Sequence, residues 1–163
     1  MEDVRDDPIV TAAAVVDATP DEAWTAWATD AGLETFLAPD CIVVLDPLSP
    51  FEAFADADEH GVVGGEENHV LGFDPETMLH LTWRPPAGLR GIREMYTSVV
   101  VRFAPVDDRR TLVTVTHDGF GHGTDWAVAR ESAAEMWQRV VLPRLAHRFR
   151  HGPVDWDDPP PPV

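Results

Sequence analysis

The residues 124–149, TDWAVARESAAEMWQRVVLPRLAHRF, form the longest stretch of the chain with a sustained helical period. Its apolar residues recur at steps of three and four and would share one side of a helix: Trp126, Ala129, Ala133, Trp137, Val140, Val141, Leu145 and Phe149. This pattern predicts one long C-terminal helix with a single face packed on a core. Because the ring nitrogen of Pro143 cannot donate to the carbonyl of Arg139, we expect a kink or a break there.

The first half of this helix carries small residues on its apolar face. Ala129 and Ala133 lie between Trp126 and Trp137, whereas the second half is filled by larger aliphatic residues. Small side chains that face a concave sheet leave room for a ligand, unless large side chains from the sheet fill that room. The sequence leaves both alternatives open.

The remaining chain predicts strands joined by turns. We expect a strand at 9–18, a helix begun by Thr19 and Pro20, a second short helix at 31–37, and strands at 41–45, 51–55, 66–73, 78–84, 92–103 and 111–117. The acidic, glycine-rich stretch 56–65 is typical of a loop. Strands that follow one another through short turns indicate an antiparallel sheet of about six to seven strands, and therefore an α+β domain.

Length and composition favour one domain. The chain has 163 residues, of which 44% are apolar, and we expect residues 1–151 to fold as a unit followed by an extended, mobile tail of proline and aspartate at 152–163, with Trp156 free to fold back. Cys41 is the single cysteine, so an internal disulfide is excluded and a reducing compartment is expected.

The chain is strongly acidic. It carries 12 basic residues, all arginine, against 29 acidic ones, for a formal net charge of -17. Nucleic acids and anionic membrane surfaces would be repelled, and Schiff-base chemistry is excluded because the chain has no lysine. The start MEDVRDDPIV lacks the features of a signal peptide, and no apolar run reaches the ~20 residues of a membrane span, so we expect a cytoplasmic protein.

Short motifs follow one another along the chain in a recognisable order: Thr19-Pro20 with Glu22 and Trp24, Leu33 to Leu37, Phe73-Asp74-Pro75 before Leu79, Leu81 and Trp83, residues 111–117 before Gly119-Phe120, Trp137 with Leu142 and Leu145, and finally Gly152-Pro153 with Asp155-Trp156. In this order they resemble the SRPBCC (START-like) superfamily and, within it, the activator of Hsp90 ATPase homologue-like group. The resemblance implies a helix-grip fold, in which a curved antiparallel sheet wraps the C-terminal helix and two short helices follow the first strand. It also implies an apolar ligand between sheet and helix, with cyclisation, dehydration or hydrolysis there in some relatives.

The candidate ligand site is the set of residues expected to face that space: Leu81, Trp83, Met95, Thr97, His117, Trp126, Ala129, Ala133 and Trp137. Candidate acid-base groups are His117, Asp118 and Glu94, with His117 otherwise a hydrogen-bonded inner residue. Glutamates 66, 67 and 94 would need a partner if they pointed inward, and Arg84 or Arg93 would supply one. No pair among the seven histidines has the i, i+4 spacing next to a glutamate that marks a zinc protease; His147 and His151 are four apart, but capping and solvation at the helix end explain them better than a metal, and no cofactor motif is present.

Three functions remain open from sequence. The first is a domain that binds a small apolar molecule, the second is an enzyme that uses the same cavity, and the third is a chaperone-accessory or protein-interaction module. The expected partner is a small apolar molecule, with no nucleic acid and no membrane. A homodimer is compatible with the sequence.

Overall fold

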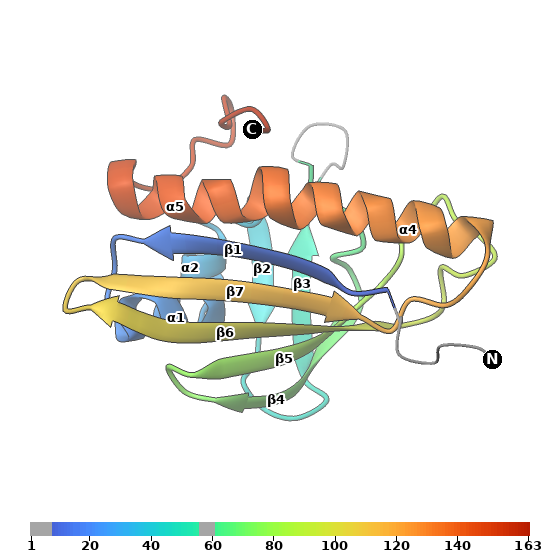
Figure 1. Ribbon diagram of the computed structural model, residues 1–163, viewed down its shortest axis with the longest axis horizontal. Helices are drawn as coiled ribbons and strands as arrows, with labels where there is room; N and C mark the ends of the chain where they lie inside the picture. Colours follow the sequence, from blue (N-terminus) through green and yellow to red (C-terminus); the bar gives the residue numbers. More distant parts are fainter. Residues whose placement is uncertain (1–7, 56–60) are drawn as a thin grey trace, which may run out of the picture.

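Seven strands form one antiparallel sheet in the computed structural model, which describes residues 8–55 and 61–163 (Figure 1). In chain order the strands are β1 Val10–Val16, β2 Asp40–Val43, β3 Pro50–Phe54, β4 Asn68–Asp74, β5 Met78–Trp83, β6 Thr97–Asp107 and β7 Arg110–Asp118. Across the sheet their order is β1-β7-β6-β5-β4-β3-β2. From β2 to β7 each strand therefore lies beside its neighbour in the chain, as the short turns predict.

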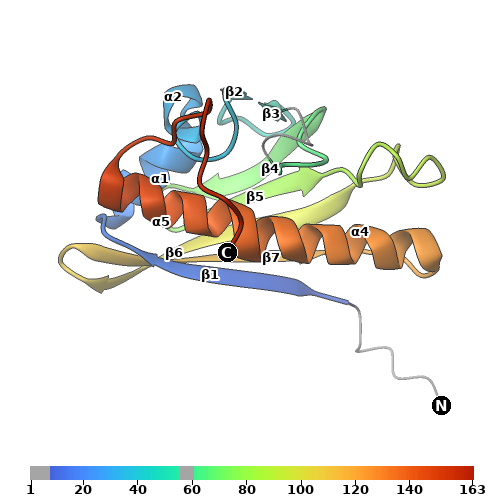
Figure 2. The same ribbon diagram turned by 90° about the horizontal axis from the view of Figure 1, so that it is seen from above.

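The long C-terminal helix consists of α4 Thr124–Glu135, η1 Met136–Val141 and α5 Leu142–His151. It lies along the sheet, and the short helices α1 Pro20–Ala28 and α2 Asp30–Leu33 lie toward the end of the sheet near α5 (Figures 1 and 2). The predicted α+β helix-grip fold is confirmed. Of the predicted loop 56–65, residues 56–60 lie outside the described residues.

The apolar face of the helix is buried as its period predicts. Ala129, Ala133, Trp137 and Leu145 are at most 5% exposed, whereas Trp126 and Phe149, at the two ends of the stripe, are only partly buried. On β5, Leu79, Leu81 and Trp83 face the same core and alternate with Met78 and His80. Helix and sheet thus share one hydrophobic interior.

The start of α1 follows its sequence signal. The Thr19 hydroxyl accepts from the Glu22 amide at 3.2 Å, and the Glu22 carboxylate accepts from the Thr19 amide at 3.0 Å. This pair of bonds satisfies two amides that a helix start leaves without partners. The same hydrogen bonds hold the pKa of Glu22 below its ordinary value.

The second short helix is shorter than predicted. Residues 31–37 were expected to be helical, but α2 ends at Leu33 and the chain continues in turns to Leu37. Carboxylates at the two ends of α2 reach the edge strand β2: Asp30 accepts from the Val43 amide at 2.8 Å and Glu34 from the Cys41 amide at 3.1 Å. These bonds satisfy amides that another chain would otherwise pair with.

Of the kink or break predicted at Pro143, the break does not occur, because the chain stays helical through this residue. The irregularity lies one turn earlier, in the π-helical segment η1, and Pro143 then occupies the start of α5, where its missing amide is tolerated. Pro143 has no amide hydrogen to donate to the carbonyl of Arg139. That carbonyl accepts a hydrogen bond from the amide of Val163 at 3.0 Å. The tail therefore supplies a donor that the helix lacks.

The C-terminal residues pack on the domain, whereas the sequence suggested an extended, mobile tail. Val154 is 5% exposed and its amide donates to the carbonyl of Thr35 at 2.9 Å. The indole of Trp156 donates to the carbonyl of Glu34 at 2.7 Å, and the guanidinium of Arg144 lies 5.6 Å from the Trp156 ring centroid. These contacts fold the tail back across α5 and the turn after α2.

The longest strand begins later than predicted. We expected a strand over 92–103, but residues 91–94 form turns and β6 starts at Thr97. The reason is its partner: β5 ends at Trp83, paired with Thr97, and Pro85 and Pro86 follow, which cannot donate ladder hydrogen bonds. Without a partner strand, the preceding residues close into a loop with Arg84 at its base.

Candidate functional site

A line of hydrogen bonds crosses the apolar interior beneath the helix. The Trp137 indole donates to His117 Nδ1 at 3.0 Å, His117 Nε2 lies 2.6 Å from the Thr97 hydroxyl, and that hydroxyl donates to the Trp83 carbonyl at 2.7 Å. All four residues are at most 5% exposed. The line joins β5, β6, β7 and η1, so it fixes the helix against three strands.

The partners of His117 determine its protonation. An indole nitrogen can only donate, so Nδ1 of the neutral ring accepts from Trp137 and the ring proton resides on Nε2, where it points to Thr97. Burial lowers the pKa of His117 to about 3, because a charged imidazole would lose its hydration. His117 is therefore neutral at physiological pH, and both of its ring nitrogens are engaged.

The space beneath the small-residue half of the helix is nearly filled. A cavity of about 10 Å³ remains between strands and helix, about the size that one water molecule needs. It is lined by residues from five stretches of the chain: Val63, Trp83, Arg84, Pro85, Pro86, Thr97, His117, Phe120, Ala129, Ser132, Ala133 and Met136. The large side chains of Phe120, Trp83 and Met136 occupy the room that Ala129 and Ala133 leave.

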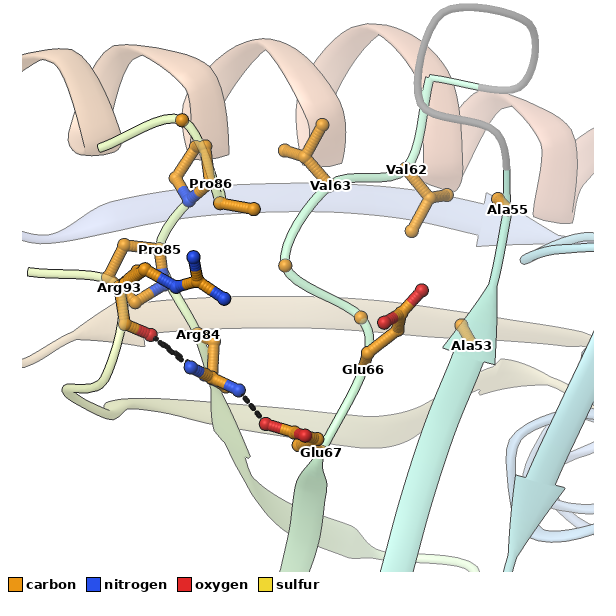
Figure 3. A pocket seen from close by; sticks show the side chains of 14 residues that line it. Ala53, Ala55, Val62, Val63, Glu66, Glu67, Arg84, Pro85, Pro86 and Arg93 are labelled. Atoms are coloured by element: carbon orange, nitrogen blue, oxygen red, sulfur yellow. Dashed lines mark hydrogen bonds and ion pairs between the residues drawn. The ribbon is translucent and has the colours of Figure 1, made fainter. Parts of the chain in front are cut away.

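A larger cleft adjoins this space. It measures about 370 Å³ and lies between the end of β3, the segment 62–67 that precedes β4, and the loop 84–93 (Figure 3). Its apolar lining includes Ala53, Val62 and Pro85, and its polar lining consists of Glu66, Glu67, Arg84 and Arg93. Its volume falls within the ordinary range for small-molecule sites.

The cleft and the buried space share a wall. Val63, Arg84, Pro85 and Pro86 line both of them. Val63 is held at its carbonyl by the Trp83 indole at 2.8 Å and at its amide by the Met136 sulfur at 3.4 Å. These four residues thus separate the cleft from the small-residue face of α4.

An ion-pair cluster forms the polar side of the cleft. The Arg84 guanidinium donates to the carbonyl of Arg93 at 2.8 and 2.6 Å, pairs with the carboxylate of Glu67, and lies 3.4 Å from that of Glu94. The Arg84 side chain is only 12% exposed. Arg84 therefore ties the loop to the start of β4, and of the three glutamates named as possible partners it pairs with Glu67 and Glu94, whose side chains are 68% and 79% exposed. Figure 3 shows the guanidinium groups of Arg84 and Arg93 on the same side of the cleft.

The structure brings together five of the predicted ligand residues: Trp83, Thr97, His117, Ala129 and Ala133 line the buried space. Leu81 and Trp137 are fully buried beside them in the core. Trp126 lies apart, partly buried against Phe120. Met95 is not on a strand and is 52% exposed, because β6 begins two residues later.

The candidate acid-base residues do not converge. His117 points into the core, and Asp118, the next residue on the same strand, points to the opposite face. The Glu94 side chain is 79% exposed and pairs with Arg84 and Arg93. No general acid-base pair is assembled from these three residues.

Several lining residues were not predicted: Val63, Pro85, Pro86, Phe120, Ser132 and Met136. Ser132 and Met136 follow Ala129 at helical spacing, so the helical period could have predicted them. Val63 and Pro85 lie in irregular segments, for which no period exists. Their positions depend on how distant loops meet.

In the described part of the chain, no group of three or more histidine, cysteine, aspartate or glutamate side chains lies close enough to hold a metal ion. None of its helices is both long and apolar enough to cross a membrane.

Comparisons with known proteins agree with this architecture. A family model described as "Activator of Hsp90 ATPase homolog 1-like protein" matches residues 17–150. The comparison with curated proteins found no match.

Solved structures share the fold at low sequence identity. The protein MLL2253 from Mesorhizobium loti has a TM-score of 0.65 and 17% identity, over 87% of this chain and 93% of its own. The Aha1 dimer from Colwellia psychrerythraea has a TM-score of 0.64 and 18% identity, over 89% of this chain and 98% of its own. DynU16, a protein in the dynemicin biosynthetic locus, has a TM-score of 0.62 and 17% identity, over 90% of this chain and 49% of its own.

Proposed function

Because the chain belongs to the Activator of Hsp90 ATPase homolog 1-like family, we propose that it binds a small, largely apolar molecule between its sheet and helix α4. The molecule enters through the cleft bordered by the loop 84–93. The observation that carries this proposal is the wall that the cleft shares with the small-residue face of the helix.

The shared wall offers a way to enlarge the buried space. Val63 is held by the Trp83 indole and by a weak contact with the Met136 sulfur, and the amide of Arg84 reaches the Gly64 carbonyl at 3.3 Å, near the upper limit of a hydrogen bond. Met136 is flexible and readily repacks. Displacement of Val63 and Met136 would join the cleft to Ala129 and Ala133, where an apolar ligand would lose contact with water.

Native mass spectrometry of the protein purified from cells, repeated after denaturation, tests this proposal. We expect a stoichiometric apolar molecule that is released on denaturation. The variant Ala133→Leu fills the buried space and should lose the adduct, whereas Ala127→Leu, on the exposed side of α4, should keep it. The proposal is wrong if no adduct appears and apolar fluorophores also fail to bind.

A chaperone-accessory role is a second candidate, favoured by the description of the matching family and by exposed apolar residues. Ile42, Val44, Leu48 and Leu71 are between 37% and 74% exposed, and the Leu48 amide bonds to the carbonyl of Val70, next to Leu71. Exposed apolar side chains of this kind suit contact with a protein partner if they gather in one patch. This role predicts that the purified chain stimulates the ATPase of an Hsp90-type chaperone, and that Leu48→Asp removes the stimulation while the fold persists.

We also propose a cytoplasmic location and a homodimer. The homodimer is suggested by the structural neighbour described as an Aha1 dimer, and the location by the acidic, lysine-free chain with its single buried cysteine. Light scattering after gel filtration would give the mass of the particle, and a monomer at every concentration would contradict the homodimer.

A further inference from the structure

The loop that borders the cleft has an unusual charge. Residues 84–93, RPPAGLRGIR, contain three arginines and no acidic residue, in a chain whose net charge is -17. Two of these arginines, Arg84 and Arg93, line the cleft. The third, Arg90, is exposed and does not line it.

The two lining arginines differ in how firmly they are held. Arg84 is nearly buried, with its guanidinium engaged by the Arg93 carbonyl and by Glu67. The Arg93 side chain is 49% exposed, and the ion pair recorded for it is with its neighbour Glu94, at 3.4 Å, whose side chain is 79% exposed. An exposed pair of this kind contributes little free energy, so another anion can replace Glu94 at small cost.

The carboxylates around the cleft leave Arg93 accessible from the cleft side. Glu67 is engaged by Arg84, Glu94 lies in the exposed loop after Arg93, and the Glu66 carboxylate points away from Arg93 in Figure 3. The Arg93 guanidinium is directed from its loop toward the segment 62–67. Its position places a positive charge beside an apolar surface formed by Val63, Pro85 and Pro86.

We propose that the molecule bound in the cleft is an organic anion, an apolar body with one carboxylate, whose carboxylate pairs with Arg93 while its body lies on Val63, Pro85 and Pro86. This inference rests on the proposed function and specifies its ligand. Guanidinium and carboxylate match in shape and charge, and the apolar wall leads from Arg93 toward the helix. Repulsion by the acidic chain is screened beyond about 10 Å at 0.1 M salt, so the local contact decides binding.

Two pairs of ligands separate the contribution of the anionic group from that of the apolar body. Anilinonaphthalene sulfonate and phenylnaphthylamine share one apolar skeleton, with and without an anionic group, and both become fluorescent in apolar sites. Decanoate and decanol share one alkyl chain and differ in the same way. Direct titration with the first pair, and displacement of phenylnaphthylamine by the second, would be measured on the full chain.

The matched variants are Arg93→Gln and Arg90→Gln. The Arg93 carbonyl, which holds Arg84, is retained in the first, so the loop keeps its anchor. We expect Arg93→Gln to weaken binding of the sulfonate and of decanoate by about fivefold and to leave phenylnaphthylamine and decanol unchanged. Arg90→Gln should alter none of the four, and circular dichroism should show both variants folded.

The outcomes separate the two proposals. If phenylnaphthylamine binds but decanoate competes no better than decanol, or if Arg93→Gln leaves the anions unaffected, the anionic ligand is overturned and apolar binding stands. Equal losses of anion binding in Arg93→Gln and Arg90→Gln would also overturn it, because they would reflect the charge of the loop as a whole. If none of the four compounds binds, the proposed function fails together with this inference.

Discussion

The His117 ring is held by a donor on one side and a hydroxyl on the other, and this arrangement governs its chemistry. With Nδ1 accepting from Trp137 and Nε2 directed to Thr97, the ring presents no lone pair to a substrate. Its role in this state is to link the helix to the sheet. A base at this position would first have to lose the bond from Trp137.

His117 also makes stability depend on pH. Its pKa is about 3 in the folded chain and would be near 6.5 when unfolded, so the unfolded state binds the extra proton between these values. The free energy of unfolding should therefore be unaffected above pH 6.5 and fall as the pH drops below it, by about 1.4 kcal/mol per pH unit. Urea unfolding at about pH 7 and about pH 5.5 measures this loss. His117→Gln should lack that part of the slope, and identical slopes in the two proteins would contradict the prediction.

Trp137 is fully buried and touches Trp27, Trp83 and His117. Replacement by alanine removes these contacts and leaves a cavity, so Trp137→Ala should lower the free energy of unfolding by about 3 to 5 kcal/mol. Chemical denaturation gives this value directly. A loss below about 1 kcal/mol would indicate that the ring only lines a space that collapses easily.

Among the helices and strands, α1 has the clearest start signal in the sequence, the capping pair Thr19 and Glu22. Thr19→Ala removes the side-chain acceptor for the Glu22 amide and should cost about 1 kcal/mol. Thr25→Ala, within the same helix, is the control: its hydroxyl bonds to the Asp21 carbonyl and its loss should be close to neutral. Equal effects of the two substitutions in thermal unfolding would contradict a specific capping role.

The C-terminal tail packs on α5 and should stabilise the fold through Trp156. Trp156→Ala removes the hydrogen bond to Glu34 and the ring beneath the Arg144 guanidinium, so we expect a loss of about 1 kcal/mol, or roughly 2 to 4 °C in Tm. Pro161→Ala, at an exposed position of the tail, should leave Tm unchanged. A Trp156 variant with unchanged Tm would show that the tail adds nothing to stability.

At the scale of the whole molecule, the net charge of -17 opposes the compact state. Screening weakens this repulsion, so the free energy of unfolding should rise when sodium chloride is raised from about 20 mM to about 500 mM. Thermal unfolding across that range measures the effect. Potassium chloride should give the same gain, since the cause is screening; a gain with only one salt would point to a specific ion instead.

Features that depend on near neighbours were predicted from the sequence. The buried face of the helix, the capping residues of α1, the alternation on β5 and β7, and the antiparallel pairing of successive strands from β2 to β7 follow from residues that are near in the sequence. Five of the predicted residues line the buried space for the same reason, because periodicity tells which side of a strand or helix each residue occupies.

What the sequence could not determine was how much space remained where these elements meet. The alanines of α4 predicted room, but Phe120, Met136 and Trp83 reach into it from separate segments, and Val63 closes it through a contact with Met136, 73 residues away. The start of β6 likewise depended on where β5 ends. The Arg139 carbonyl, to which Pro143 has no amide to donate, accepts a hydrogen bond from Val163 in the tail. The sequence by itself determined which faces are apolar, because that is a local property. The tertiary structure alone decided which side chains fill the space between them, because close packing joins residues that no local pattern relates.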